Sequence, residues 1–322
     1  MPYRLGYACI NNALRDKKIR ANRRAIKRTF QQKGLEYIGQ LVAQNLTDLH
    51  TILEWNNKFD IRVFRMSSDI TPWGSEYEFT DLPNADEVMA LFKKCGQYAL
   101  DHDIRLSFHP GQFCVLASPK EKVVLNAISD LELHGRLMDA FQQPRNHLAK
   151  INIHLGGAYG DKQTAAQRFN KNFPRLSEAV RSRLTVENDD RVNLFSTQEL
   201  YDYVYTETGI PIVFDFHHHA IHPDGLSEQE GLALAFKTWQ VRPCTHYSES
   251  KQVERPTALL RAHSTLIYKK IQDHGFDFDC VVEAKGKEQA VLLHRRKHGN
   301  EMISYNSNNP LYNNKDQNRS IQ

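Results

Sequence analysis

The chain has 322 residues, of which 40% are hydrophobic and 25% are charged, and its net charge is +4. These values exclude a wholly disordered chain, and no apolar run approaches the ~20 residues of a membrane span. Five cysteines without CxxC spacing and an N-terminus without a secretory pattern favour an intracellular protein and exclude a disulfide scaffold.

Eight short apolar runs along the chain are typical of buried strands. They span residues 5–10, 61–66, 104–108, 150–153, 183–186, 210–214, 244–248 and 278–282. The runs are continuous rather than alternating, as expected for a parallel sheet that is covered on both faces. Helices are predicted between them at residues 84–101, 121–142, 163–181, 196–208, 226–239 and 256–274.

This alternation of strand and helix predicts the fold. Eight strands separated by helices indicate an α/β protein, a single-domain (β/α)8 TIM barrel over residues 1–298. A doubly wound open sheet is the alternative, because it also alternates, but it has no need of eight strands. Residues 299–322 contain seven asparagines and few large apolar groups, so we expect a polar, Asn-rich, disordered tail.

Potential metal ligands stand where the predicted strands end. In an α/β barrel these ends converge on one rim, where active sites lie. The side chains at these positions are imidazoles and carboxylates: His109, His154, Glu187, Asp215, His218, His246 and Glu283. Such donors suit divalent Mn, Zn, Fe or Co, and they outnumber the ligands of one ion. The set predicts two or three metal ions, although any one of these histidines alone would more often be structural.

The chain contains 15 histidines, and the remaining ones need separate interpretations. Because alternate residues of an extended chain face opposite ways, only some of His217, His218 and His219 can face the metal with Asp215. His222 and His263 are further candidate ligands. The others are interpreted as surface or helix histidines: His50, His102, His134, His147, His274, His294 and His298.

Two predicted rim loops pair an aromatic ring with an amide. Gln112 and Phe113 follow His109, and an amide beside an exposed ring can hydrogen-bond a base edge and stack on its face. Tyr7 with Asn11 and Asn12 offers the same pairing after the first strand. The simpler interpretation is that Phe113 packs beneath its own loop.

A basic segment follows the first predicted strand. Residues 15–33 contain nine lysines or arginines and one acidic residue, Asp16. Such a run is usually a solvated helix face, but its place near the rim favours contact with a phosphate backbone. Lys285 and Lys287, just after Glu283, would add to the positive charge of this rim.

Several motifs resemble the UV damage endonuclease family. They are LGY at 5–7, FRMSSD at 64–69, SFHPGQF at 107–113, NIHLGG at 152–157, VEND at 186–189, DFHH at 215–218 and VEAKGKE at 282–288. The resemblance runs from about residue 3 to about residue 290 and extends more distantly to the barrel of endonuclease IV. It implies a metal-dependent nuclease that nicks DNA immediately 5′ of cyclobutane pyrimidine dimers and 6-4 photoproducts, leaving a 3′ hydroxyl and a 5′ phosphate.

The resemblance also implies roles for individual residues. The metal ligands would be His109, His154, Glu187, Asp215, His218, His246, His263 and Glu283. Manganese is the favoured ion, with zinc or magnesium as alternatives. Gln112 and Phe113, beside Tyr7 and Asn11, would probe the lesion, and some members have tyrosine in place of Phe113.

Three residues have more specific expected roles. Glu187 lies in the middle of the predicted rim, so we expect it to bridge two ions and act as a catalytic residue, together with Lys285. Cys244 stands where a family member can carry a modified lysine ligand, so water, hydroxide or the thiolate would take that ligand's place. The expected partner is double-stranded damaged DNA, bound by a monomer without a membrane.

Three other functions are compatible with parts of the pattern. An apurinic-site nuclease of the endonuclease IV type would use a similar metal cluster. A metal-dependent sugar isomerase on the same fold would want neither rim aromatics nor a basic stretch, so Gln112, Phe113 and residues 15–33 speak against it. A non-catalytic binder of damaged DNA would keep its binding after metal removal and would not nick.

Overall fold

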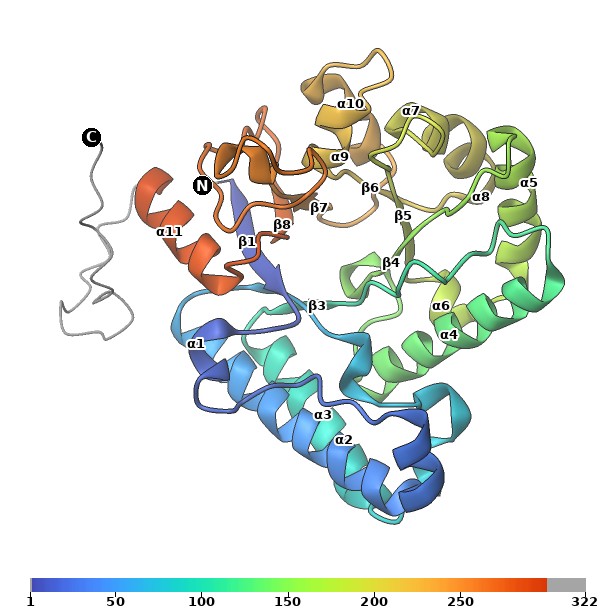
Figure 1. Ribbon diagram of the computed structural model, residues 1–322, viewed down its shortest axis with the longest axis vertical. Coiled ribbons are helices and arrows are strands. Elements are labelled where there is room, and N and C mark those ends of the chain that lie inside the picture. The colour runs from blue at the N-terminus through green and yellow to red at the C-terminus, as the bar shows by residue number, and fades with distance from the viewer. Residues whose placement is uncertain (1, 300–322) are drawn as a thin grey trace.

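Eight parallel strands curl around the centre of the molecule, and helices surround them (Figure 1). The computed structural model describes residues 2–299. The strands are β1 (Tyr3–Ala8), β2 (Val63–Arg65), β3 (Arg105–Ser107), β4 (Ile151–His154), β5 (Leu184–Glu187), β6 (Ile212–Val213), β7 (Cys244–Tyr247) and β8 (Phe278–Val282). All eight strands overlap the predicted apolar runs.

The strands form two ladders, ordered β3-β2-β1-β8-β7 and β4-β5-β6. Single parallel bridges, Phe108 to Ile151 and Asp215 to His246, link the two ladders at both junctions. Chain order is kept around the sheet and β1 lies beside β8, which a doubly wound sheet would not give. The α/β fold with a curled parallel sheet is therefore confirmed, whereas full closure into a (β/α)8 barrel stays a prediction.

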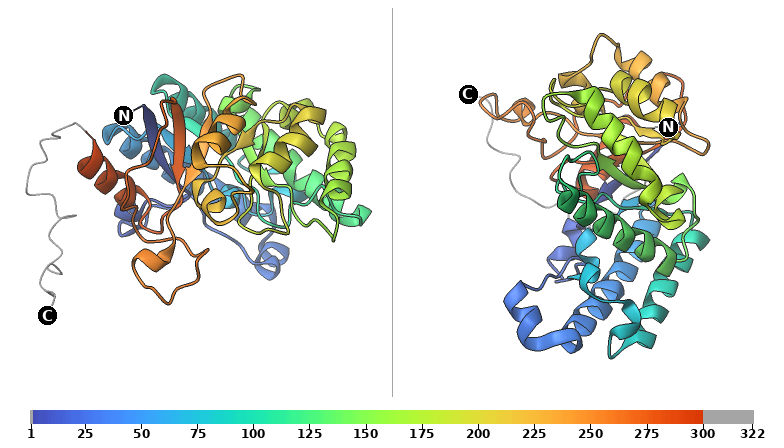
Figure 2. Two further views of the ribbon diagram at one scale, coloured as in Figure 1. Left: turned by 90° about the horizontal axis from the view of Figure 1, so that it is seen from above. Right: turned by 90° about the vertical axis from the view of Figure 1, so that its right-hand side faces the viewer.

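The α-helices lie outside this sheet (Figures 1 and 2). They are α1 (Asn12–Arg15), α2 (Lys27–Lys58), α3 (Ala85–Asp101), α4 (Glu121–Ala140), α5 (Lys162–Asn172), α6 (Glu178–Arg181), α7 (Thr197–Leu200), α8 (Thr206–Thr208), α9 (Phe216–Ile221), α10 (Glu228–Phe236) and α11 (Glu288–His298). A π-helical turn, Tyr201–Tyr205, joins α7 to α8. Short 3-10 turns lie at Ser68–Ile70, Gly74–Glu76, Phe79–Asp81, His147–Ala149, Phe173–Arg175 and Lys251–Val253.

The helix predicted at residues 256–274 is wrong, because that segment is irregular. Side chains take the hydrogen bonds that a helix would form. The Glu254 carboxylate accepts the backbone N–H groups of Thr265 and Leu266, and the Glu249 carboxylate accepts those of Tyr268 and Lys269. The other predicted helices are present, with ends within a few residues of those expected. Two of them, at residues 163–181 and 196–208, are interrupted.

The sheet contains one very close strand contact and one buried ion cluster. Gly6 on β1 lies so close to β2 that a Cβ atom there would stand 1.8 Å from the Val63 carbonyl oxygen. Asp279 lies at the end of the sheet where the strands begin. Three arginine side chains pair with its carboxylate: Arg4, Arg105 and Arg242. The predicted tail lies outside the described residues except for Gly299, and no described helix is long and apolar enough to cross a membrane.

Candidate metal centre

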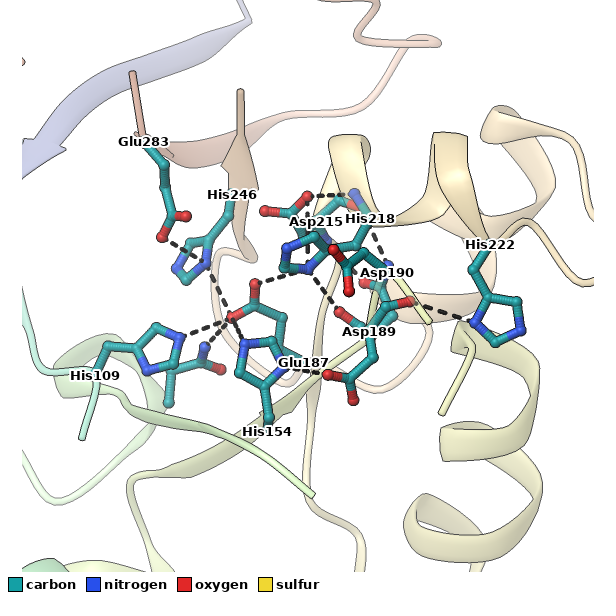
Figure 3. A network of polar contacts seen from close by, with 12 residues as sticks. His109, His154, Glu187, Asp189, Asp190, Asp215, His218, His222, His246 and Glu283 are labelled. Carbon is teal, nitrogen blue, oxygen red and sulfur yellow. Dashed lines mark hydrogen bonds and ion pairs between the residues drawn. The ribbon is translucent and has the colours of Figure 1, made fainter. Parts of the chain in front are cut away.

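The carboxylate of Glu187, at the end of β5, lies at the centre of a cluster of histidines (Figure 3). Its Oε2 lies 3.0 Å from His246 Nδ1 and 3.2 Å from His109 Nε2. Its Oε1 lies 3.5 Å from His218 Nδ1, and His154 Nε2 is 4.0 Å from Oε2. Glu187 is 1% exposed, so this carboxylate faces the imidazoles rather than water.

Three overlapping groups of side chains each bring candidate ligand atoms within 4.8 Å of one another. The groups are His109, His154 and Glu187; then Glu187, Asp215 and His218; and finally Asp215, His246 and Glu283. Glu187 and Asp215 each belong to two groups. Shared carboxylates of this kind can bridge neighbouring ions, so the geometry could hold more than one metal ion.

An unpaired polar atom tests whether the cluster fits metal ions. Asp215 Oδ2 is buried and has no hydrogen-bond partner in the described part of the chain. A buried polar atom without a partner is costly, and a divalent ion would satisfy this oxygen. The donor set of imidazole nitrogens and carboxylate oxygens also suits zinc or manganese. The residues present therefore fit a metal centre.

The charges in the cluster act strongly on one another. Burial opposes ionisation of Glu187, but His246, His154 and His109 hold the pKa of its carboxyl well below the ordinary value. Burial alone would lower the pKa of His154, yet Glu187 and Asp189 raise it to about 10. Without metal, protons therefore occupy nitrogen atoms that a metal ion would need.

Asp215 and His246 behave in the opposite way. Burial raises the pKa of Asp215 to about 7, against the opposing charge of His218. Burial also lowers the pKa of His246 to about 3, although Glu187 lies beside it. A neutral imidazole is the form that binds metal, so His246 is ready for coordination at neutral pH.

Four neighbours of the cluster were not predicted from the sequence. Asn152 donates its amide to Glu187, and Arg65 donates to Glu283. The Nζ of the buried Lys150 lies 3.0 Å from His246 Nε2, and Asp189 Oδ1 lies 3.1 Å from His154 Nδ1. These contacts orient the candidate ligands. Three of the four stand inside the motifs that carried the family resemblance, which was the available signal.

The remaining candidate histidines lie at different places relative to the cluster. His263 Nδ1 lies 3.7 Å from Glu283 Oε2, beside the cluster but outside the three groups. His222 Nδ1 lies 3.3 Å from the Asp189 carbonyl oxygen. The expectation that residues 217–219 are extended is wrong, because Asp215 caps α9 through the His218 N–H and all three histidines are helical. Of these three, His218 has its ring nitrogen within 3.5 Å of Glu187.

Buried Cys244 on β7 was expected to mark a change in the ligand set. It belongs to none of the three groups, and its thiol contacts the Thr245 carbonyl oxygen at 3.8 Å. The amine of Lys150, just before β4, contacts Nε2 of the His246 ring at 3.0 Å.

The two predicted aromatic–amide pairs differ in exposure. Gln112 is exposed and Phe113 is 83% exposed, so Phe113 does not pack beneath its loop. Tyr7 and Asn11 are fully buried, and their role beside the lesion stays a prediction. The Tyr7 hydroxyl donates to Asn56 Oδ1 at 2.6 Å and accepts from Asn11 Nδ2 at 2.9 Å, and Asn11 also caps α1. Packing and helix capping occupy both side chains.

Basic side chains lie near the same ends of the strands. Four of them line a hollow of about 390 Å³ after β1: Arg15, Lys18, Arg20 and Arg23. Arg23 pairs with Asp48, and Arg24 pairs with Asp69. Lys285 is exposed just after β8, and Lys287 is partly buried. The expected positive rim is present, although some of its charge is neutralised by local ion pairs.

A cavity of about 770 Å³ adjoins the cluster. His154 and His218 form part of its wall, and Gln112, Tyr159, Asp189 and Arg191 lie around it. It therefore opens from the candidate metal ligands towards the exposed loop that carries Gln112. The fold and this site together define a class: an α/β protein with a candidate metal centre at the carboxyl ends of its parallel strands.

The particular family follows from comparison with known proteins. The sequence matches UV-endonuclease UvdE over residues 3–312, and the chain belongs to this family. A UV-damage endonuclease of Schizosaccharomyces pombe is 38% identical over 314 residues, which cover 90% of this chain and 49% of that protein. A UV DNA damage endonuclease of Clostridium perfringens is 34% identical over 301 residues, covering 90% and 69%.

A solved structure agrees with this membership. The crystal structure of SacUVDE matches with a TM-score of 0.82 and 31% identity, covering 92% of this chain and 97% of the other. The chain spans about half the length of the Schizosaccharomyces pombe relative. The activity of that longer protein is therefore not assigned to this chain. The resemblance seen in the motifs is confirmed at the level of the family.

Proposed function

We propose that the chain is a metal-dependent endonuclease that nicks DNA immediately 5′ of UV photoproducts. The observation that carries the proposal is the Glu187-centred cluster, which lies beside the exposed Gln112 and Phe113. Family membership supports the reaction, since the matched relatives are named as endonucleases for UV-damaged DNA. The products would be a 3′ hydroxyl and a 5′ phosphate, and the eight strands would close as a (β/α)8 barrel of residues 1–298.

Eight side chains would hold two or three divalent ions, with manganese favoured. They are His109, His154, Glu187, Asp215, His218, His246, His263 and Glu283. Bound there, the ions would supply Lewis-acid stabilisation of the phosphate and lower the pKa of water. Glu187 would contribute by sharing its two oxygens between sites, and Lys150 would keep the His246 ring oriented.

The chain's own residues would select and hold damaged duplex. A lesion weakens stacking, so kinking the damaged duplex costs less than kinking intact DNA. Phe113 and Gln112 would fill the gap that displaced bases leave, and the adjoining cavity could receive displaced nucleotides. Lys285 and the basic residues after β1 would bind phosphates at the rim.

One experiment tests the proposal directly. A duplex with one defined photoproduct is incubated with the chelated protein, with and without Mn²⁺, and the position of any nick is mapped. We expect incision 5′ of the photoproduct only when Mn²⁺ is present. Cutting at abasic sites alone would favour the endonuclease IV type of activity, and binding without any metal-dependent cut would favour a non-catalytic damage binder.

A matched pair of variants assigns the nick to the cluster. Glu187→Gln removes the central charge with little change in shape, so nicking should disappear while binding of the damaged duplex remains. Glu36→Gln on α2 serves as the control, since Glu36 is exposed and its carboxylate accepts a hydrogen bond from Gln40 on the same helix. Near-full activity of Glu187→Gln would show that the cluster is not the nuclease centre.

A further inference from the structure

The long segment between β7 and β8 carries two adjacent leucines at its apex. Leu259 is 80% exposed and Leu260 is 50% exposed. Exposed apolar side chains are common singly, but an adjacent pair on a projecting loop needs an explanation. In the left view of Figure 2, the orange segment that contains these residues projects from the body of the molecule. We call Leu259 and Leu260 the apical leucines.

Local hydrogen bonds hold this apex in one shape. Ser250 and His263 form an antiparallel bridge at its base, and the Lys251 N–H donates to the Ala262 carbonyl oxygen at 2.6 Å. The Gln252 amide donates to the Ala258 carbonyl oxygen at 2.9 Å, just before the apical leucines. The leucines are therefore displayed by a braced turn, and the solvent exposure of their side chains is part of the folded structure.

The base of the segment is tied to the candidate metal centre. His263 lies beside Glu283, and Arg261 Nε lies 3.1 Å from Asp190 Oδ2, which borders the cavity. The segment begins directly after β7, the strand that carries His246. The apical leucines consequently stand on the same face of the molecule as the cluster.

The loop that carries Phe113 approaches from the other side. It follows β3, and β3 and β7 are the two end strands of the five-stranded ladder. In a ring of eight strands, these two strands are opposite one another. His109 and His246, which come from these two strands' ends, have ring centroids only 5.7 Å apart across the cluster. Phe113 and the apical leucines thus flank the candidate metal centre.

The charges around the apex favour a polyanionic partner. Arg255 and Arg261 are exposed on either side of the apical leucines, and Lys269 and Lys270 are exposed further along the segment. The acidic Glu254 is occupied by the Thr265 and Leu266 N–H groups and by the Tyr268 hydroxyl. Apolar side chains set among cations are typical of residues that wedge into a base step while phosphates are held nearby.

We propose that the apical leucines form a second wedge, which enters the duplex on the side of the metal centre opposite Phe113. The proposal rests on the proposed function, because it assumes that damaged duplex DNA lies across the cluster. With wedges on both sides, the enzyme would bend the duplex about the scissile phosphate. Leucine has no hydrogen-bonding group on its side chain, so this wedge would recognise deformability rather than sequence.

The test uses the full chain with Glu187→Gln, so that binding is measured without cleavage. Leu259→Ser with Leu260→Ser is added to one sample, and Leu100→Ser to the control. Leu100 is 46% exposed near the end of α3, where the chain enters β3 at the opposite face. A photoproduct duplex carries 2-aminopurine at successive steps around the lesion, and its fluorescence reports unstacking.

We expect the double variant to bind about ten- to a hundredfold more weakly and to lose the fluorescence increase at one or two steps. The dependence of affinity on salt should be unchanged, because no charge is removed. Leu259→Met with Leu260→Met should restore binding. Thermal unfolding of the serine variant should match the parent, since both side chains are exposed.

Two results would overturn the proposal. One is unchanged affinity and unstacking in the serine variant. The other is a loss of self-association in that variant with unchanged DNA binding, which would make the apex a contact between two copies. Failure of the nuclease proposal gives a different result, namely no Mn²⁺-dependent nicking by the parent chain, and leaves the binding and unstacking measurements interpretable.

Discussion

Two buried charged clusters lie at opposite ends of the strands, and they differ in how fully their polar atoms are paired. At the end where strands begin, Asp279 binds Arg4, Arg105 and Arg242 at 2.7–3.1 Å. Arg105 further donates to backbone carbonyl oxygens of Leu148 and His147. At the other end, Asp215 keeps a buried carboxylate oxygen, Oδ2, without a hydrogen-bond partner among the described residues.

This difference suggests that one cluster stabilises the fold and that the other binds metal. In the Asp279 cluster both carboxylate oxygens are paired with arginines, and Arg105 is further held by backbone carbonyl oxygens. The Glu187 cluster gathers acids and imidazoles whose charges are only partly compensated, and it needs a further ligand to become complete. We therefore expect changes at Asp279 to alter stability, and changes at Glu187 to alter metal binding and nicking.

The largest expected effect is on catalysis. Glu187→Gln should reduce metal-dependent nicking of irradiated plasmid by more than about a hundredfold, since even partners of metal ligands are worth 10–100-fold. Denaturation by urea should show a folded protein. A variant that is inactive only because it is unfolded would contradict the separation of the two clusters.

The next effect is on stability. Asp279→Ala leaves the buried Arg105 without its carboxylate and should lower the free energy of unfolding by about 3–5 kcal/mol, measured by urea denaturation. The folded fraction should retain nicking activity. The matched control is Asp103→Ala, which removes the exposed partner of Arg4 and should cost about 0–1 kcal/mol. Equal losses in the two variants would contradict a special role for the buried cluster.

Metal should stabilise the protein through the Glu187 cluster. Mn²⁺ at about 100 times its dissociation constant should add about 2.7 kcal/mol to the free energy of unfolding of the chelated protein. Differential scanning fluorimetry should show the rise in Tm for the parent and for Asp279→Ala, and a smaller rise for Glu187→Gln. An equal rise in all three proteins would place the binding site elsewhere.

The smallest expected effect is the loss of stability at low pH. Burial opposes ionisation of Asp279, but Arg4 and Arg105 lower its pKa below the ordinary value of 3.8. Its contribution to stability is therefore present above about pH 4 and is lost as the pH falls through the lowered pKa. Urea titrations from pH 5 to pH 2 should show a steeper loss in the parent than in Asp279→Ala. Parallel curves would mean that other groups dominate.

Several parts of this picture could be predicted from the sequence. The eight strands were recognisable as continuous apolar runs, and the residues that end them include the members of the three ligand groups. Helix α2 was not predicted, although Ile38, Val42, Leu46 and Leu49 form a buried stripe at helical spacing. The signal for this helix was therefore present in the sequence.

Other features depended on contacts between distant segments. Residues 256–274 have helical composition, but the carboxylates of Glu249 and Glu254 capture their backbone N–H groups. Tyr7 looked like an exposed rim aromatic until the fold placed Asn56 and Asn11 against its hydroxyl. Lys150 and His246 are 96 residues apart, and their contact has no local pattern.

The strands, the types of ligand at their ends and the family can be recognised in short segments, because burial and ligand chemistry are local properties. The donors that share Glu187, the aromatic side chain that is exposed and the position of the apical leucines depend on how the chain folds. Those outcomes depend on the curvature of the sheet and on side-chain hydrogen bonds across it, since both bring together residues that are far apart along the chain.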